Sequence, residues 1–120
     1  MNSLTFYNQD GEAIAYLDED GKHIWSFNGD ALGYLDRGGV FNYNGKFVGW
    51  LDGGCMWDLY GNCAFFTEQA TMGPMKPVRE VRPVRGVREV KPVKSVKEVR
   101  PVRPVSSLSW SEFTGTEFFE

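Results

Sequence analysis

Ten valines recur at an unbroken spacing of three residues in the C-terminal half of the chain. Each belongs to a triplet X-Val-(Lys/Arg), where X is Pro, Glu, Gly or Ser, and the last triplet ends in Ser106. An α-helix has 3.6 residues per turn and a strand a period of two, so neither keeps these valines on one side. Polyproline II has three residues per turn, and the prolines of this segment fix φ near its value. We therefore expect an extended, polyproline II structure around these residues: Val78, Val81, Val84, Val87, Val90, Val93, Val96, Val99, Val102 and Val105.

This valine-rich segment divides the sequence into three parts. We expect residues 1–73 to form a domain, residues 74–105 to form an extended arm, and residues 106–120 to form a short tail rich in aromatic residues. The domain has three basic residues against ten acidic ones, a net charge of −7, whereas the arm has ten against three, a net charge of +7. Opposite charges on joined segments favour docking of one segment on the other, or on a neighbouring copy. Two independently solvated surfaces are the alternative.

Four similar units follow one another in the domain, at residues 7–18, 25–36, 41–52 and 57–68. Each is centred on a glycine: Gly11, Gly29, Gly45 or Gly61. The second and third units carry Asn-Gly, which is typical of a two-residue type I′ turn, and turn-forming residues also link the units. These features predict an all-β domain of four consecutive β-hairpins.

Both faces of each predicted hairpin are substantially apolar. In the second unit, a two-residue turn places one set of side chains on one face: Trp25, Phe27, Leu32 and Tyr34. The opposite face then carries Ile24, Ala31, Gly33 and Leu35. One face can fill a shared core, while the small residues of the other, such as Ala15, Gly33 and Gly49, permit another backbone to approach closely. We assign most of the aromatic residues to the core.

The second and third units share the pattern Asn-Gly-x-x-(Leu/Val)-Gly-(Tyr/Trp)-Leu-Asp, at residues 28–36 and 44–52. In this pattern the domain resembles the bacterial four-fold β-flower domain family, and the resemblance extends over residues 4–68. The segment Ser107-Leu-Ser-Trp-Ser111 is similar to one that follows proline-rich linkers in that family. The resemblance implies four hairpins in a pseudo-four-fold, flower-like arrangement. It supplies no catalytic residues to carry over.

The arm is too long to lie straight on so small a domain. At ~3.1 Å per residue it would extend ~90 Å, whereas the domain should be ~30–35 Å across, so the arm must wrap around it, fold back or leave it. We expect the valines to dock on an apolar face of the hairpins, in the same chain or in a second copy. A solvated linker, unselected expansion of a short repeat and binding of a separate protein partner are the alternatives. The residues expected to carry the interaction are Val78, Val84, Val90, Val96, Val102, Arg79, Arg82, Arg85 and Trp110.

Candidate chemical sites are few. His23 is the only histidine and is expected in an exposed turn, and Cys55 and Cys63 are expected to be free thiols, because their spacing fits neither a CxxC motif nor a disulfide framework. One carboxylate follows each unit, and the four could converge on an oxygen-seeking metal, although capping of the adjacent turn is the simpler interpretation. These carboxylates belong to Asp18, Asp36, Asp52 and Glu68. We expect no metal, no cofactor and no catalytic residues.

The remaining patterns narrow the class of function. No apolar run approaches the ~20 residues of a membrane-spanning helix, and residues 1–5 resemble no secretion signal, so a cytoplasmic location is the default expectation. The basic arm could contact nucleic-acid phosphates, but the acidic domain and the regularly spaced arm glutamates disfavour this.

We expect a non-enzymatic structural or protein-interaction module that self-associates or clasps a partner through its arm. In the tail, we expect five residues to anchor the chain end: Leu108, Trp110, Phe113, Phe118 and Phe119. The alternative function is binding of glycans or anionic polymers through exposed aromatic residues and the arm.

Overall fold

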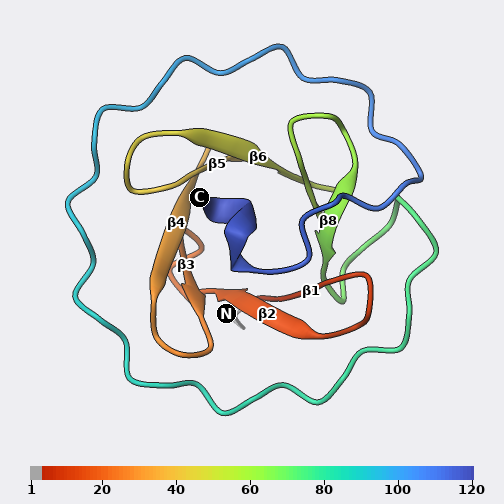
Figure 1. The fold of residues 1–120 in the computed structure, drawn as a ribbon, viewed down its shortest axis with the longest axis horizontal. Helices are drawn as coiled ribbons and strands as arrows, with labels where there is room; N and C mark the ends of the chain where they lie inside the picture. The colour runs from red at the N-terminus through yellow and green to blue at the C-terminus, as the bar shows by residue number, and fades with distance from the viewer. Residues whose placement is uncertain (1–3) are drawn as a thin grey trace.

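A computed structural model describes residues 4–120. Residues 1–3 lie outside the described residues. They belong to the predicted domain 1–73 and to the first five residues, in which no secretion signal was expected. Eight strands form one closed antiparallel barrel, in which each strand pairs with the next and β8 pairs with β1 (Figure 1). The strands are β1 (Leu4–Tyr7), β2 (Ala13–Leu17), β3 (His23–Ser26), β4 (Ala31–Asp36), β5 (Gly39–Phe41), β6 (Phe47–Asp52), β7 (Cys55–Trp57) and β8 (Cys63–Phe66). The predicted all-β fold of four consecutive hairpins is confirmed.

The hairpin loops are one residue longer than the sequence predicts. In the second unit the N–H of Ser26 donates to the carbonyl of Asp30, so the intervening residues 27–29 form a three-residue loop. Gly29 has a φ of +97°, but Asn28 is not in the positive-φ region, and a type I′ turn requires both. The prediction of two-residue turns is therefore wrong.

A polar side chain three residues before each loop glycine holds the longer loop. In the third unit, Asn42 Oδ1 accepts hydrogen bonds from the backbone N–H groups of Asn44 at 3.0 Å and Lys46 at 3.1 Å. These bonds span the loop and are absent from a two-residue turn, so they favour the wider geometry. The equivalent residues in the four units are Asn8, Ser26, Asn42 and Asp58.

Each longer loop also shifts the pairing of its hairpin. Trp25 pairs with Ala31 and Ile24 pairs with Gly33, which leaves Leu32 as the extra residue of a β-bulge. Leu32 therefore packs against the barrel interior, while Ala31 packs against the outer aromatic residues, the reverse of their predicted faces. The same shift occurs in the other three hairpins.

The barrel interior is filled from equivalent positions of all four hairpins and from the tail. The hairpins contribute Phe6, Ile24, Val40 and Met56, all fully buried. A short 3₁₀-helix, η1 (Thr116–Phe119), lies at the centre of the ring of strands (Figure 1) and adds its two phenylalanines to this core. The tail therefore fills the centre of the barrel.

The predicted anchors of the tail are confirmed in part. Phe118 and Phe119 are buried, and the rings fit because a Cβ at Gly49 would lie 2.8 Å from Phe118. Phe113 packs against the same core and Trp110 against Phe66. Leu108 is 78% exposed, so its predicted anchoring role is wrong. Backbone hydrogen bonds between β8 and residues 109–111 fix this part of the tail.

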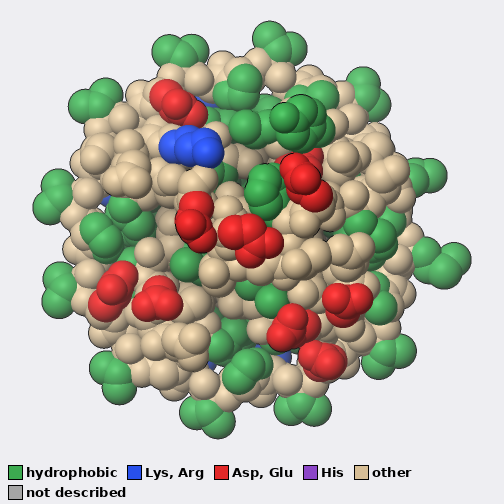
Figure 2. All heavy atoms as spheres, viewed as in Figure 1, with side chains coloured by type: hydrophobic (Ala, Val, Ile, Leu, Met, Phe, Trp, Pro, Cys, Tyr) green, Lys and Arg blue, Asp and Glu red, His purple; other side chains and the backbone are tan. Residues whose placement is uncertain are grey.

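The arm encircles the barrel once, passing outside all four hairpins before the tail turns inward (Figure 1). The molecule measures 36 × 35 × 26 Å. Of the three courses predicted from the length of the arm, the arm wraps around the barrel; it does not fold back or leave it. No helix or strand lies within residues 77–105, and polyproline II stays a prediction. Hydrophobic side chains project at intervals around the edge of the molecule, and carboxylates gather on the face seen in Figure 2.

Candidate interaction surface

Backbone hydrogen bonds attach the arm to each hairpin loop at intervals of nine residues. Four N–H groups of the arm and tail donate to the carbonyls of the four loop glycines, at 2.8–2.9 Å. The donors are Glu80, Glu89, Glu98 and Ser107, and the acceptors are Gly11, Gly29, Gly45 and Gly61, in that order. Nine residues are three triplets, so three triplets of the arm correspond to one hairpin of the barrel.

The loop glycines are required by this contact as well as by the turn. A Cβ at Gly29 would collide with the backbone carbonyl of Val87, and one at Gly45 would collide with that of Val96. Each glycine also has a positive φ, which an L-residue with a side chain rarely adopts. The Asn-Gly pattern therefore marks both a turn and the place where the arm rests.

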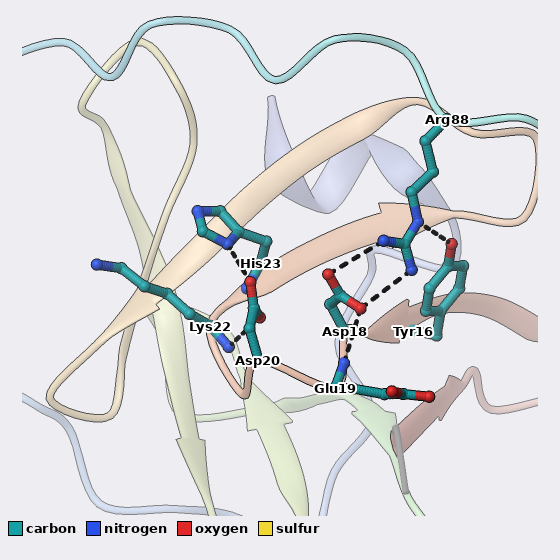
Figure 3. Close-up of polar contacts among 7 residues, drawn as sticks. All are labelled: Tyr16, Asp18, Glu19, Asp20, Lys22, His23 and Arg88. Carbon is teal, nitrogen blue, oxygen red and sulfur yellow. Dashed lines mark hydrogen bonds and ion pairs between the residues drawn. The ribbon is translucent and has the colours of Figure 1, made fainter. Parts of the chain in front are cut away.

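Between neighbouring hairpins, a carboxylate and aromatic rings form a site for an arm cation, here called a junction site. At the first junction, the two terminal nitrogens of Arg88 lie 3.1 Å from the two Asp18 oxygens, and its Nε donates to the Tyr16 hydroxyl at 2.9 Å (Figure 3). Its guanidinium carbon lies 4.9 Å from the Trp25 ring centre. Burial opposes the charge, but the bonds to Tyr16 and Asp18 outweigh it and raise the pKa of Arg88 above its usual value. This arginine is therefore held in its charged form.

The next junction repeats this chemistry with a lysine. Lys97, nine residues after Arg88, has its Nζ 3.0 Å from Asp36 Oδ2 and 5.9 Å from the Phe41 ring centre. The hydrogen bond from Lys97 lowers the pKa of Asp36, with smaller contributions from the charges of Arg37 and Arg100. An opposite charge and an aromatic face thus recur nine residues apart along the arm.

The two remaining junctions show where the repeat weakens. Arg79 lies 3.8 Å from Glu68 and is 43% exposed. The fourth position of the nine-residue series is Ser106, and there Arg103 binds the carboxylate instead, with its Nη1 3.0 Å from Asp52. Every one of the four unit-ending carboxylates is therefore paired with an arm cation.

Two arm glutamates bind the barrel backbone. Glu89 Oε1 accepts the N–H of Ala31 at 2.8 Å, and Glu98 Oε1 accepts the N–H of Phe47 at 2.6 Å. Ala31 and Phe47 are the first residues of β4 and β6. These two glutamates, which lower the net positive charge of the arm, thus accept hydrogen bonds at the start of the second strand in two successive hairpins.

The valine side chains point away from the barrel, and we call them together the valine rim. All ten are between 89% and 95% exposed. The prediction that the valines dock on an apolar face of their own chain is therefore wrong. The outer surface of the hairpins presents aromatic rings beside carboxylates, which attract cations more strongly than valines. The arm accordingly turns its basic side inward.

The predicted interaction residues lie in three places: the basic side of the arm that faces the barrel, the valine rim and the tail. Arg85 stacks 3.8 Å from the Tyr16 ring centre, and Arg79 and Arg82 line a hollow beside Glu68. Trp110 lies apart from them in the half-buried part of the tail. Five members of the valine rim complete the predicted set: Val78, Val84, Val90, Val96 and Val102.

Four residues that contact the barrel closely are absent from the predicted interaction set: Arg88, Lys97, Glu89 and Glu98. A signal for them exists, because a basic residue followed by glutamate recurs every nine residues within the triplets. This pair occurs as Arg79-Glu80, Arg88-Glu89 and Lys97-Glu98. Recognising that nine-residue period would have assigned one segment of the arm to each hairpin.

Other candidate chemistry is limited. Within residues 4–120 no group of three or more His, Cys, Asp or Glu side chains is arranged to hold a metal. Asp18 also accepts the N–H of Glu19 at 2.7 Å, so the predicted capping role is confirmed for this carboxylate. Cys55 and Cys63 are free and buried, as predicted. A hydrogen bond shared with Cys55, together with burial, raises the pKa of the Cys63 thiol.

His23 is less exposed than the sequence predicts, because it begins β3 instead of lying in the turn. Its side chain is 12% exposed, and Nδ1 lies 2.6 Å from Asp20 Oδ2 (Figure 3). Burial alone would raise the pKa of Asp20, but hydrogen bonds from the His23 ring and from the N–H groups of His23 and Lys22 outweigh it and lower the pKa to about 2. This turn is therefore stabilised by an ionised carboxylate.

We expect the Asp20 turn to lose its stabilisation in acid. Because the folded-state pKa lies below the unfolded value of about 4, the contribution is fully present above pH ~4 and disappears as the pH falls toward ~2. Asp20→Asn should flatten this part of the stability profile measured by urea unfolding at successive pH values. An unchanged profile in Asp20→Asn would contradict the role of this carboxylate.

Loss of the arginine at the first junction should loosen the arm. Arg88→Ala removes one ion pair and two cation–π contacts, which together contribute roughly 1–2 kcal/mol at a partly exposed site. We expect a lower urea midpoint and faster proteolysis of the arm. Arg82→Ala is the matched control, because in the described part of the chain Arg82 has no ion pair or ring contact. Equal effects of the two substitutions would refute the junction site.

Comparisons with known proteins place this architecture in a family. Between Leu4 and Glu120 no helix is long and apolar enough to cross a membrane. A search of curated proteins and a search of solved structures each found no match. The family model for the 4-fold beta flower protein matches residues 4–119, which include the barrel, the arm and most of the tail. Because this match covers almost the whole described chain, the chain belongs to the 4-fold beta flower family.

Proposed function

We propose that this protein is a non-enzymatic protein-interaction module whose contact surface is the valine rim. One observation carries the proposal: ten valines, each at least 89% exposed, are presented at regular intervals on a segment whose other side is attached to the barrel. An apolar side chain that stays exposed on a fixed backbone is available for contact with a partner, and ten of them on one side of the arm support a protein-binding surface.

The attachment of the arm supports this proposal physically. A free valine-rich peptide loses backbone entropy of about 1–2 kcal/mol per residue when a partner orders it. The hydrogen bonds and junction sites already hold the arm in place, so a partner that binds the rim meets a preorganised surface. The barrel then serves as the frame that presents the rim.

The alternative function, binding of glycans or anionic polymers, is less well supported. It requires exposed aromatic rings and free cations, but Tyr16, Trp25 and Phe41 are at most 2% exposed. Arg88, Lys97 and other arm cations lie over these rings. A polymer would have to displace the arm before it could reach these rings.

A photo-cross-linking amino acid at the rim tests the proposal directly. Placed at Val84 or Val93 of the full chain in living cells, it should give discrete protein adducts that mass spectrometry identifies. The same amino acid at Leu108, which is exposed but off the rim, is the matched control. An adduct to the chain itself indicates self-association, and one to another protein identifies a partner. No adduct at the rim, or equal adducts at Leu108, would overturn the proposal.

A further inference from the structure

The arm binds the barrel entirely from outside. No residue of the arm belongs to the interior core, and the ring of strands from β1 to β8 closes without it. The contacts are backbone hydrogen bonds to the loops and cation contacts at the junctions, each confined to a short segment of arm and the hairpins that it crosses. None of them depends on the arm and the barrel belonging to the same chain.

The outer surface of the barrel is a repeated site for one kind of ligand, an extended basic segment. At each loop a glycine carbonyl accepts a backbone N–H, and at the adjoining junction a carboxylate pairs with a cation. A ligand must place these two groups side by side every nine residues, as Arg88-Glu89 and Lys97-Glu98 do. The +7 arm of any copy satisfies both this spacing and the charge of the −7 domain.

The connection between β8 and the arm offers one place where the chain could change direction. The N–H groups of Thr67 and Thr71 donate to the carbonyls of Gly54 and Gly53, so the first part of the connection is held on the barrel. Beyond it, Gly73 has a φ of +93° immediately before Pro74. A change of direction there would carry the arm and the tail away together, and both could then occupy the equivalent places on another barrel. Exchange of identical elements across such a connection is a common route to dimers.

We infer that the barrel is a receptor for the arm and tail of a second copy, so that two chains exchange residues 77–120 with each other. The junction sites and the loop glycines select this partner, because they require a cation and a backbone donor at nine-residue intervals. This inference does not depend on the valine rim, which faces outward whichever barrel holds the arm.

A pair of charge-reversed chains tests the exchange. The first chain carries Arg88→Glu and Lys97→Glu, which makes its arm a poor ligand for its own barrel. The second carries Asp18→Lys and Asp36→Lys, which makes its barrel a poor receptor for its own arm. Each arm then matches only the barrel of the other chain. Mixing should raise the dimer fraction, measured by native mass spectrometry, at least tenfold over either chain alone.

The control is one chain that carries all four substitutions, because its own arm and barrel match again. It should give the same dimer fraction as the unsubstituted chain. If this control folds and the mixture gives no mixed dimer, the inference is wrong.

The unsubstituted chain provides a test that does not depend on folding of the variants. Two preparations, one of them labelled with heavy nitrogen, are mixed and incubated at low and at raised salt. We expect dimers of intermediate mass, formed faster at raised salt because screening weakens the junction sites. Absence of intermediate-mass dimers at every salt concentration would overturn the inference.

Discussion

A backbone hydrogen bond from every ninth residue of the arm to a loop glycine sets the geometry on which the rest of the structure depends. Glu80, Glu89 and Glu98 each donate to a glycine carbonyl at 2.8–2.9 Å. Each glycine has a positive φ and leaves no room for a side chain beneath the arm. The spacing converts a linear triplet repeat into a ring, because three triplets cover the distance from one hairpin to the next.

The direction of every arm side chain follows from this alignment. With a period of three, fixing one residue of each triplet also fixes the other two. Most of the basic residues face the rings and carboxylates of the barrel, and the valines face the solvent. Individual contacts are weak, since a hydrogen bond contributes about 1 kcal/mol and an exposed cation–π contact ~0.5–1 kcal/mol. The arm is held because these contacts recur at all four hairpins.

The sequence predicted the fold better than it predicted the interaction surface. Regular turn signals and the glycine spacing predict four hairpins. Asn28-Gly29 by itself predicts a two-residue turn, because the dipeptide does not include Ser26, whose hydroxyl accepts the N–H of Asp30 and favours the longer loop. The valines were expected to face the barrel because apolar residues are usually buried. That expectation failed because the hairpin surface pairs aromatic rings with carboxylates, and this pairing becomes apparent only when residues 70 positions apart, such as Asp18 and Arg88, are brought together. The central position of Phe118 and Phe119 likewise depends on the closure of the barrel.

Hydrogen exchange of the arm amides in the full chain tests the central claim most directly. If the arm is aligned on the barrel by a contact every nine residues, the amides of Glu80, Glu89 and Glu98 should exchange at least ~10-fold more slowly than the amide of the valine that follows each of them. The amides of Gly86 and Ser95, which donate to the carbonyls of Phe27 and Tyr43, should also be slow and are nine residues apart. The pattern of slow amides should therefore repeat every nine residues. Uniformly fast exchange throughout residues 77–105, or slow exchange with a period of three, would contradict this account.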